Sequence, residues 1–119
     1  MLSNHEVSLE ASPVLSELYL ENKECLPLVI QFLKSLPEKI ELLQKYIHEN
    51  NLIELKVLSH KLAGSAGLYG YPEFHKVLKA LEKLSESGDL SKSDILLVKI
   101  KSKFKTIMSG YEIMQSEIA

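Results

Sequence analysis

Cysteine occurs only once among the 119 residues of the chain, as Cys25. A single thiol cannot form a disulfide within the chain, and this count fits the reducing environment of the cytoplasm. The sequence also lacks any apolar run approaching the roughly 20 residues of a transmembrane helix, and no basic stretch followed by an apolar one opens it. We therefore expect a cytoplasmic protein that does not insert into a membrane.

An excess of positive charge is lacking as well. The formal net charge is −2 and the pI is near 6.1, so the chain as a whole does not attract nucleic acid. The lysines near the C-terminus occupy alternate positions, which spreads them around a helix and favours a solvated surface: Lys99, Lys101, Lys103 and Lys105. The phosphate-binding pattern G-x-x-x-x-G-K is also absent, so we expect no direct use of ATP.

Glycine and proline are scarce, with 5 and 4 residues, and no segment alternates apolar and polar residues over the length of a strand. Apolar residues instead recur with helical spacing, and short connections separate the long helical segments. This pattern predicts an all-α fold, an up-down antiparallel four-helix bundle with a short extra N-terminal helix. We expect one domain at 11–119 behind a flexible arm at 1–10. Met1 and this arm favour a stand-alone chain, and we expect it to be a monomer.

Local signals place the helix boundaries. Ser12 as N-cap and Pro13 as first helical residue predict the short helix at 12–20. Pro37 falls inside a longer helix whose apolar spacing continues beyond it, so we expect a kink there and no helix end. The long helices are expected at 23–48, 52–69, 72–87 and 91–114.

Two local signals mark ends of these long helices. Gly70 is typical of a residue that ends a helix. Ser91 followed by Asp94 resembles a capping box, with Asp in place of Glu, and would open the last helix.

His60 is the candidate functional residue of the helix expected at 52–69. A rotation of about 100° per residue puts the apolar positions on one side of the helix and the imidazole about 170° from their centre. The apolar stripe comprises Leu55, Leu58, Leu62, Ala66 and Tyr69. The imidazole should therefore point outward above a shallow floor of small residues, Ala63, Gly64 and Gly67. That floor leaves room for a phosphoryl group and for the protein that delivers it.

The next helix places His75, Lys79 and Glu82 together on one flank, at i, i+4 and i+7. If this flank lies beside His60, Glu82 could accept a hydrogen bond from one ring nitrogen and leave the other nitrogen free to attack. Lys79, Lys56 or Lys61 could hold the oxygens of an attached phosphoryl group: these are the candidate cations. On spacing alone, a solvated flank with a Lys79–Glu82 pair is an equally good interpretation.

The stretch His60-Lys61-Leu62-Ala63-Gly64-Ser65-Ala66, with Gly70 ten residues after His60 and Leu81-Glu82 in the next helix, resembles the histidine-containing phosphotransfer (HPt) domain. The resemblance implies that His60 carries a phosphoryl group between receiver-domain aspartates, or from a kinase to a receiver. It also implies that Gly64 gives the partner access and that Glu82 hydrogen-bonds the histidine. Such a protein is a relay in two-component signalling and not an enzyme.

The family usually has a lysine or arginine three residues after the histidine, and this chain has Ala63 there. Lys79 is our first choice for the replacement, ahead of Lys56 and Lys61. The resemblance implies receiver domains of response regulators as partners, with a hybrid sensor histidine kinase as a further candidate. We expect no cofactor in this chain, because Mg²⁺ and the catalytic aspartate would belong to the receiver.

A partner also needs a docking surface, and the candidates lie around His60 on its own helix: Ile53, Val57, Gly67 and Leu68. Packing of these residues against neighbouring helices is an equally good interpretation. The alternative function is a helical interaction module without phosphotransfer. Metal binding by His48, His60 and His75 is disfavoured, because no two of them share a helix face and no cysteine or carboxylate cluster accompanies them.

Overall fold

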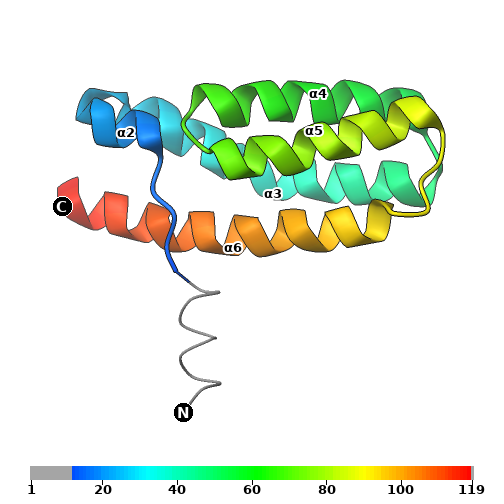
Figure 1. The fold of residues 1–119 in the computed structure, drawn as a ribbon. Helices are drawn as coiled ribbons and strands as arrows, with labels where there is room; N and C mark the ends of the chain where they lie inside the picture. The colour runs from blue at the N-terminus through cyan, green and yellow to red at the C-terminus, as the bar shows by residue number, and fades with distance from the viewer. Residues whose placement is uncertain (1–11, 119) are drawn as a thin grey trace, which may run out of the picture.

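The computed structural model describes residues 12–118, which form an antiparallel bundle of four long helices with a short helix at one end (Figure 1). The short helix α2 and a single 3-10 turn precede the bundle. The elements in chain order are α2 (Glu17–Glu21), the 3-10 turn η1 (Lys23–Cys25), α3 (Leu26–His48), α4 (Leu52–Leu68), α5 (Pro72–Ser87) and α6 (Ser93–Ile118). The all-α bundle with its extra N-terminal helix is thus confirmed, whereas the arm expected at 1–10 lies outside the described residues.

The core lies between the four long helices and is built from their apolar stripes. On α4 the predicted stripe is present: Leu55, Leu62 and Ala66 are buried, and Leu58 and Tyr69 pack partly buried against the core. α4 packs most extensively against α5, whose buried residues are Phe74, Val77, Leu78, Leu81, Glu82 and Ser85. Because one side of α4 is used for this core, its opposite side faces solvent.

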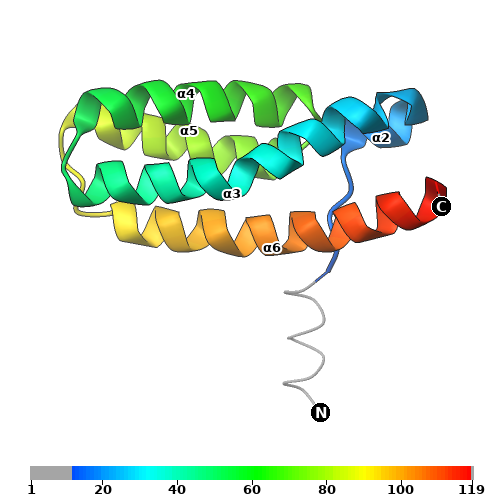
Figure 2. The same ribbon diagram turned by 180° about the vertical axis from the view of Figure 1, so that it is seen from behind.

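α3 continues through Pro37, as the apolar spacing predicted. Proline lacks the N–H that would bond one turn back, and its ring displaces the preceding turn, so a helix that contains it bends. Figure 2 shows that α3 is bent along its length. The bend keeps both halves against the core, since Leu33 before Pro37 and Ile40 after it are both buried.

The short N-terminal helix begins later than predicted. Residues 12–16 are not helical, and α2 begins at Glu17 with Ser16, not Ser12, as its N-cap. The Ser16 hydroxyl accepts from the Tyr19 N–H at 3.1 Å and donates to the carbonyl of Tyr69. Just before it, the Val14 N–H donates to the Thr106 carbonyl at 2.9 Å, which holds the segment across α6. These contacts with distant parts of the chain override the local signal of a serine followed by a proline.

The last helix also differs from its prediction at both ends. The Ser91 N–H donates to Asp89 Oδ1, so Ser91 belongs to a turn, and α6 begins at Ser93. The expected capping box is therefore wrong. At the other end α6 runs past the expected residue 114 to Ile118, and Glu117 accepts a hydrogen bond from the Tyr19 hydroxyl. The contact with α2 accounts for the extra turn.

The turn between α4 and α5 is short and tightly closed. Gly70 has a φ of 88°, a left-handed conformation that favours glycine, and it ends the helix as predicted. The N–H groups of Gly70 and Tyr71 bond back to the carbonyls of Gly67 and Ala66, the pattern of a Schellman motif. The Glu17 N–H binds the Gly70 carbonyl at 2.9 Å, so α2 fastens this turn and helps to fix the alignment of α4 with α5.

Candidate functional site

His60 lies on the solvent side of α4, and 67% of its side chain is exposed. Its outward position follows from the register of the helix, because the buried Leu55 and Leu62 occupy the opposite face. One turn further on, Gly64 is open: a Cβ added there would meet no atom within 4 Å. The ring and the backbone beside it are therefore accessible to another molecule.

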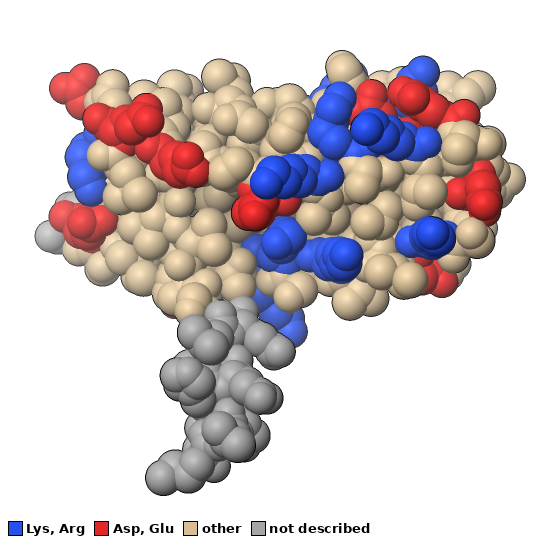
Figure 3. Space-filling model, in the orientation of Figure 1, with Lys and Arg blue, Asp and Glu red and all other residues tan. Residues whose placement is uncertain are grey.

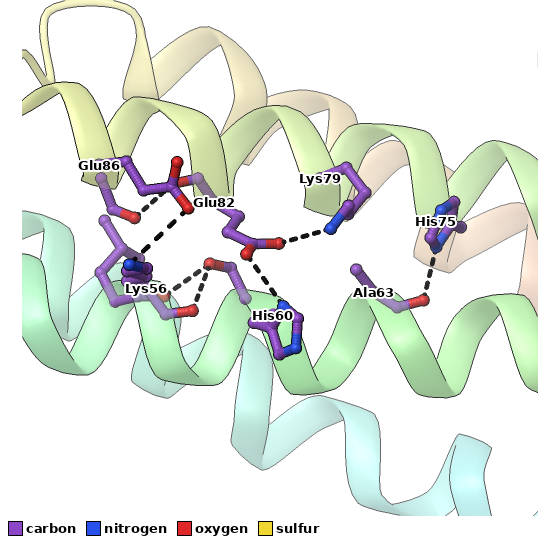
Figure 4. A network of polar contacts seen from close by, with 10 residues as sticks. Lys56, His60, Ala63, His75, Lys79, Glu82 and Glu86 are labelled. Carbon is purple, nitrogen blue, oxygen red and sulfur yellow. Dashed lines mark hydrogen bonds and ion pairs between the residues drawn. The ribbon is translucent and has the colours of Figure 1, made fainter.

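Glu82 of α5 holds the imidazole from one side. Its Oε2 lies 2.9 Å from His60 Nδ1 and its Oε1 accepts from Lys79 Nζ at 3.0 Å (Figure 4). Burial of this carboxyl opposes its ionisation, but the hydrogen bonds from Lys79 and His60 outweigh the burial and hold the pKa of Glu82 below its ordinary value of 4.5. Glu82 is consequently a carboxylate at neutral pH.

The protonation of the ring follows from this carboxylate. An ionised carboxylate can only accept hydrogen bonds, so Nδ1 of His60 must donate and carry the ring hydrogen. The other ring nitrogen, Nε2, points away from Glu82 in Figure 4. In the neutral ring Nε2 then keeps its lone pair, so the site presents a nucleophilic nitrogen to the outside.

The three candidate lysines lie in different surroundings. Lys79 is bound to Glu82, so its charge is already used to hold that carboxylate. Lys56 and Lys61, by contrast, line one surface hollow of about 670 Å³ together with His60 and Glu82. Both of these lysines are exposed, and Lys56 lies one turn before His60 on α4. Lys79, the first choice for the replacement cation, is therefore the lysine whose ammonium already lies closest to a carboxylate.

The expected floor of small residues is only partly present. Ala63 is completely buried and belongs to the core, and its carbonyl accepts from His75 Nδ1 at 2.7 Å. A Cβ added at Gly67 would lie 3.4 Å from the His75 ring, an ordinary contact, so this glycine lies beside that imidazole and is less open than Gly64. Gly64 alone among these three residues has the openness that the sequence predicted. The rotation angle could not show that His75 would reach across from α5.

The apolar docking candidates are exposed, as an interaction surface requires. Ile53 and Leu68, near the two ends of α4, are 75% and 68% exposed, and Val57 is also exposed. Ile53 and Val57 line the same hollow as His60. Ile53, Val57 and Leu68 keep much of their surface exposed and flank the imidazole on both sides along the helix, whereas Gly67 lies beside the His75 ring of α5.

Glu86 is a member of the site that the sequence analysis missed. Its Oε1 lies 3.8 Å from Lys56 Nζ, and it lines the hollow beside His60. Its position four residues after Glu82 puts it on the same flank of α5, which was the available signal. Figure 3 shows lysine and carboxylate side chains interleaved over the end of the bundle where α4 begins and α5 ends. The hollow itself is lined by two lysines and two carboxylates, and one of these carboxylates, Glu82, also binds Lys79.

Comparison with known families supports what this geometry suggests. The model of the Hpt domain family matches residues 27–109, which is most of the chain and includes all of α4 and α5. The chain therefore belongs to the Hpt domain family. Members of this family transfer phosphoryl groups through a histidine in two-component phosphorelays, interact with receiver domains and kinases, and have no ATP site of their own. No curated protein and no solved structure matches the chain significantly.

Membrane-spanning helices and metal-binding clusters can both be sought in the described part of the chain. None of the helices within residues 12–118 combines the length and the apolar character needed to span a membrane. In the same residues, no three His, Cys, Asp or Glu side chains gather as they would around a metal ion. His48, His60 and His75 lie on α3, α4 and α5, and each of the latter two has a bonding partner of its own.

Proposed function

We propose that His60 is the phosphoryl acceptor and donor of this Hpt domain and that it exchanges the group with an aspartate of a receiver domain. The observation that carries the proposal is the contact between His60 Nδ1 and the ionised Glu82 on an otherwise exposed ring. This contact directs the lone pair of Nε2 outward, where a partner can present a phosphorus atom. No other described histidine combines a carboxylate partner with this exposure.

The transfer step requires little from the chain itself. The Nε2 lone pair of His60 attacks the phosphorus of the aspartyl phosphate, and the N–P bond forms as the P–O bond to the aspartate breaks. The aspartate leaves with that electron pair as a carboxylate. The ring keeps its Nδ1 proton and gains positive charge, which the Glu82 carboxylate stabilises through the 2.9 Å contact. The reverse reaction returns the group to an aspartate by the same path.

Lys79 acts through Glu82 and not on the phosphoryl group. By donating to Glu82 Oε1 it keeps the carboxylate ionised and oriented, so that Oε2 faces the imidazole. Lys56 and Lys61 supply positive charge to the hollow in which the phosphoryl group would lie. The Mg²⁺ and the attacking or leaving aspartate belong to the receiver, and this chain contributes no cofactor.

The partner docks on the exposed face of α4. Ile53, Val57 and Leu68 form an apolar rim around His60, and Gly64 leaves the backbone open to a close approach. Receiver domains are the expected partners, and a hybrid sensor histidine kinase is a further candidate. We further propose that the chain works as a monomer in the cytoplasm, which its single cysteine fits.

The test is phosphorylation of the purified protein by potassium phosphoramidate and by a phosphorylated receiver domain. We expect the wild type to take up phosphate from both donors and His60→Gln to take up none. His75→Gln is the matched control, because His75 lies nearby on α5 but is bound to a backbone carbonyl; it should be labelled normally. Labelling of His60→Gln would remove this residue from the site. Loss of phosphate from the receiver without any gain on this chain would favour the interaction module.

A further inference from the structure

An added phosphoryl group would change the balance of charges in the hollow beside His60. It contains Lys56 and Lys61 on α4 and the carboxylates of Glu82 and Glu86 on α5, while the position three residues after His60 is the buried Ala63. A phosphoryl group on Nε2 would bring close to two negative charges at neutral pH. Glu82 is already paired with Lys79 and Glu86 with Lys56, so the phosphoryl oxygens must draw either on Lys61 or on a lysine that leaves its carboxylate.

Lys79 is poorly placed to make this exchange. Glu82 is only 7% exposed, and Lys79 donates to it at 3.0 Å. If Lys79 moved away, this buried carboxylate would lose one of the two donors that compensate for its burial, which is costly. Moreover, Lys79 does not line the hollow that contains His60.

Lys56 is better placed than Lys61. Residues four apart on a helix face the same side, so Lys56 and His60 are neighbours on α4. Lys61 directly follows His60 and therefore leaves the helix about 100° away from it. Lys56 is also held only loosely: its Nζ lies 3.8 Å from Glu86 Oε1, and about half of each side chain is exposed. Exposed ion pairs of this kind contribute little to stability, so breaking this one costs little.

We propose that Lys56 is the cation that binds the phosphoryl group on His60, and that it leaves Glu86 to do so. This inference rests on the proposed function. Lys56, one turn before His60, would then supply the positive charge that Ala63, one turn after it, does not carry. Glu86 is then a competitor of the phosphoryl group for the same ammonium. Removal of the Glu86 carboxylate should strengthen the contact between Lys56 and the phosphoryl group, and removal of Lys56 should abolish that contact.

The experiment is a pH titration of the phosphorylated protein, prepared with potassium phosphoramidate and followed by the ³¹P NMR signal of the phosphohistidine. A nearby ammonium favours the dianionic phosphoryl group and so lowers its second pKa. We expect Lys56→Met to decrease the acid dissociation constant of the phosphoryl group about two- to fivefold, the range for a partly exposed pair. Glu86→Gln should increase it, and Lys56→Met combined with Glu86→Gln should behave like Lys56→Met alone.

Lys61→Met is the matched control, since it removes the same charge from the same hollow and should shift the titration less. Lys56→Gln repeats the test with a polar side chain of similar length. A titration unchanged in both Lys56 variants, or a larger shift in Lys61→Met, would overturn the inference and leave the proposed function standing. If the wild type gave no phosphohistidine signal, the inference and the proposed function would both be overturned.

Discussion

Gly64 is a position where side chains of different size should affect stability and phosphoryl transfer differently. A Cβ at this position of α4 would meet no atom within 4 Å, so Gly64→Ala introduces no clash. Alanine favours a helix interior over glycine by about 1 kcal/mol, so the free energy of unfolding should rise by up to that amount. For a domain of this size the melting temperature should rise by about 4 °C. Urea denaturation and calorimetry measure both quantities.

A larger side chain at the same position should instead slow phosphoryl transfer from the receiver. Gly64→Leu keeps a strong helix former but places a branched side chain on the face that a receiver must approach. Overpacking of a close contact typically costs about 1–3 kcal/mol, so transfer from a phosphorylated receiver should slow by about tenfold or more. Labelling by phosphoramidate should stay near the wild-type rate, because this donor is small enough to reach His60 past the leucine.

A comparison of phosphoramidate with the phosphorylated receiver as donors distinguishes steric blocking of the partner from damage to His60. Wild-type transfer from the receiver to Gly64→Leu would refute the docking of a partner over this part of α4. Slow labelling of Gly64→Leu by both donors would mean that the substitution disturbs the imidazole itself. A lower free energy of unfolding for Gly64→Ala would contradict the openness on which both expectations depend.

Three further substitutions probe the carboxylate of the site and two turns of the bundle. Because the pKa of Glu82 is lowered in the folded state, its carboxylate contributes stability that is fully present above about pH 4.5 and is lost as the pH falls through the folded-state pKa. The difference in free energy of unfolding between the wild type and Glu82→Gln should therefore shrink from pH 7 to pH 3 in urea titrations; an equal difference at both pH values would contradict this assignment. Gly70 and Gly88 both have positive φ, and this conformation alone should cost alanine about 1–2 kcal/mol of the free energy of unfolding at either position. At Gly70 the loss should be clearly larger, because the added Cβ would overlap the backbone nitrogen of Leu18, whereas at Gly88 it would only touch Leu52 at 4.0 Å; equal losses in thermal denaturation would argue against the tight contact between α2 and the turn.

The helical spacing of apolar residues was sufficient to predict the bundle. Burial on α4 and α5 follows that spacing, because each long helix has to bury one side against its neighbours. The errors at α2 and at the C-terminal end of α6 fall where contacts between distant residues meet the local structure. Ser16, and not Ser12, caps α2 because its hydroxyl also reaches the Tyr69 carbonyl, and no local pattern contains that information.

The part of the site that depends on which side of its helix a residue lies could be predicted from the sequence. The outward imidazole and its carboxylate partner follow from the phases of α4 and α5 once the two helices are neighbours. The sequence could not show which lysine is already engaged, since Lys79 and Lys56 have equally plausible spacing and only their partners differ. It also could not show that the His75 ring would lie beside Gly67, because that depends on the distance between the helices.

The short turn between α4 and α5 has a consequence for how such a chain can vary. His60, its carboxylate partner and both lysine–carboxylate contacts all come from these two consecutive helices. The reactive unit is thus one contiguous stretch, 52–87, and the other helices contribute a scaffold that keeps its two halves from sliding. Substitutions in α3 or α6 should accordingly change the stability of the domain while leaving the reactive groups of α4 and α5 in place.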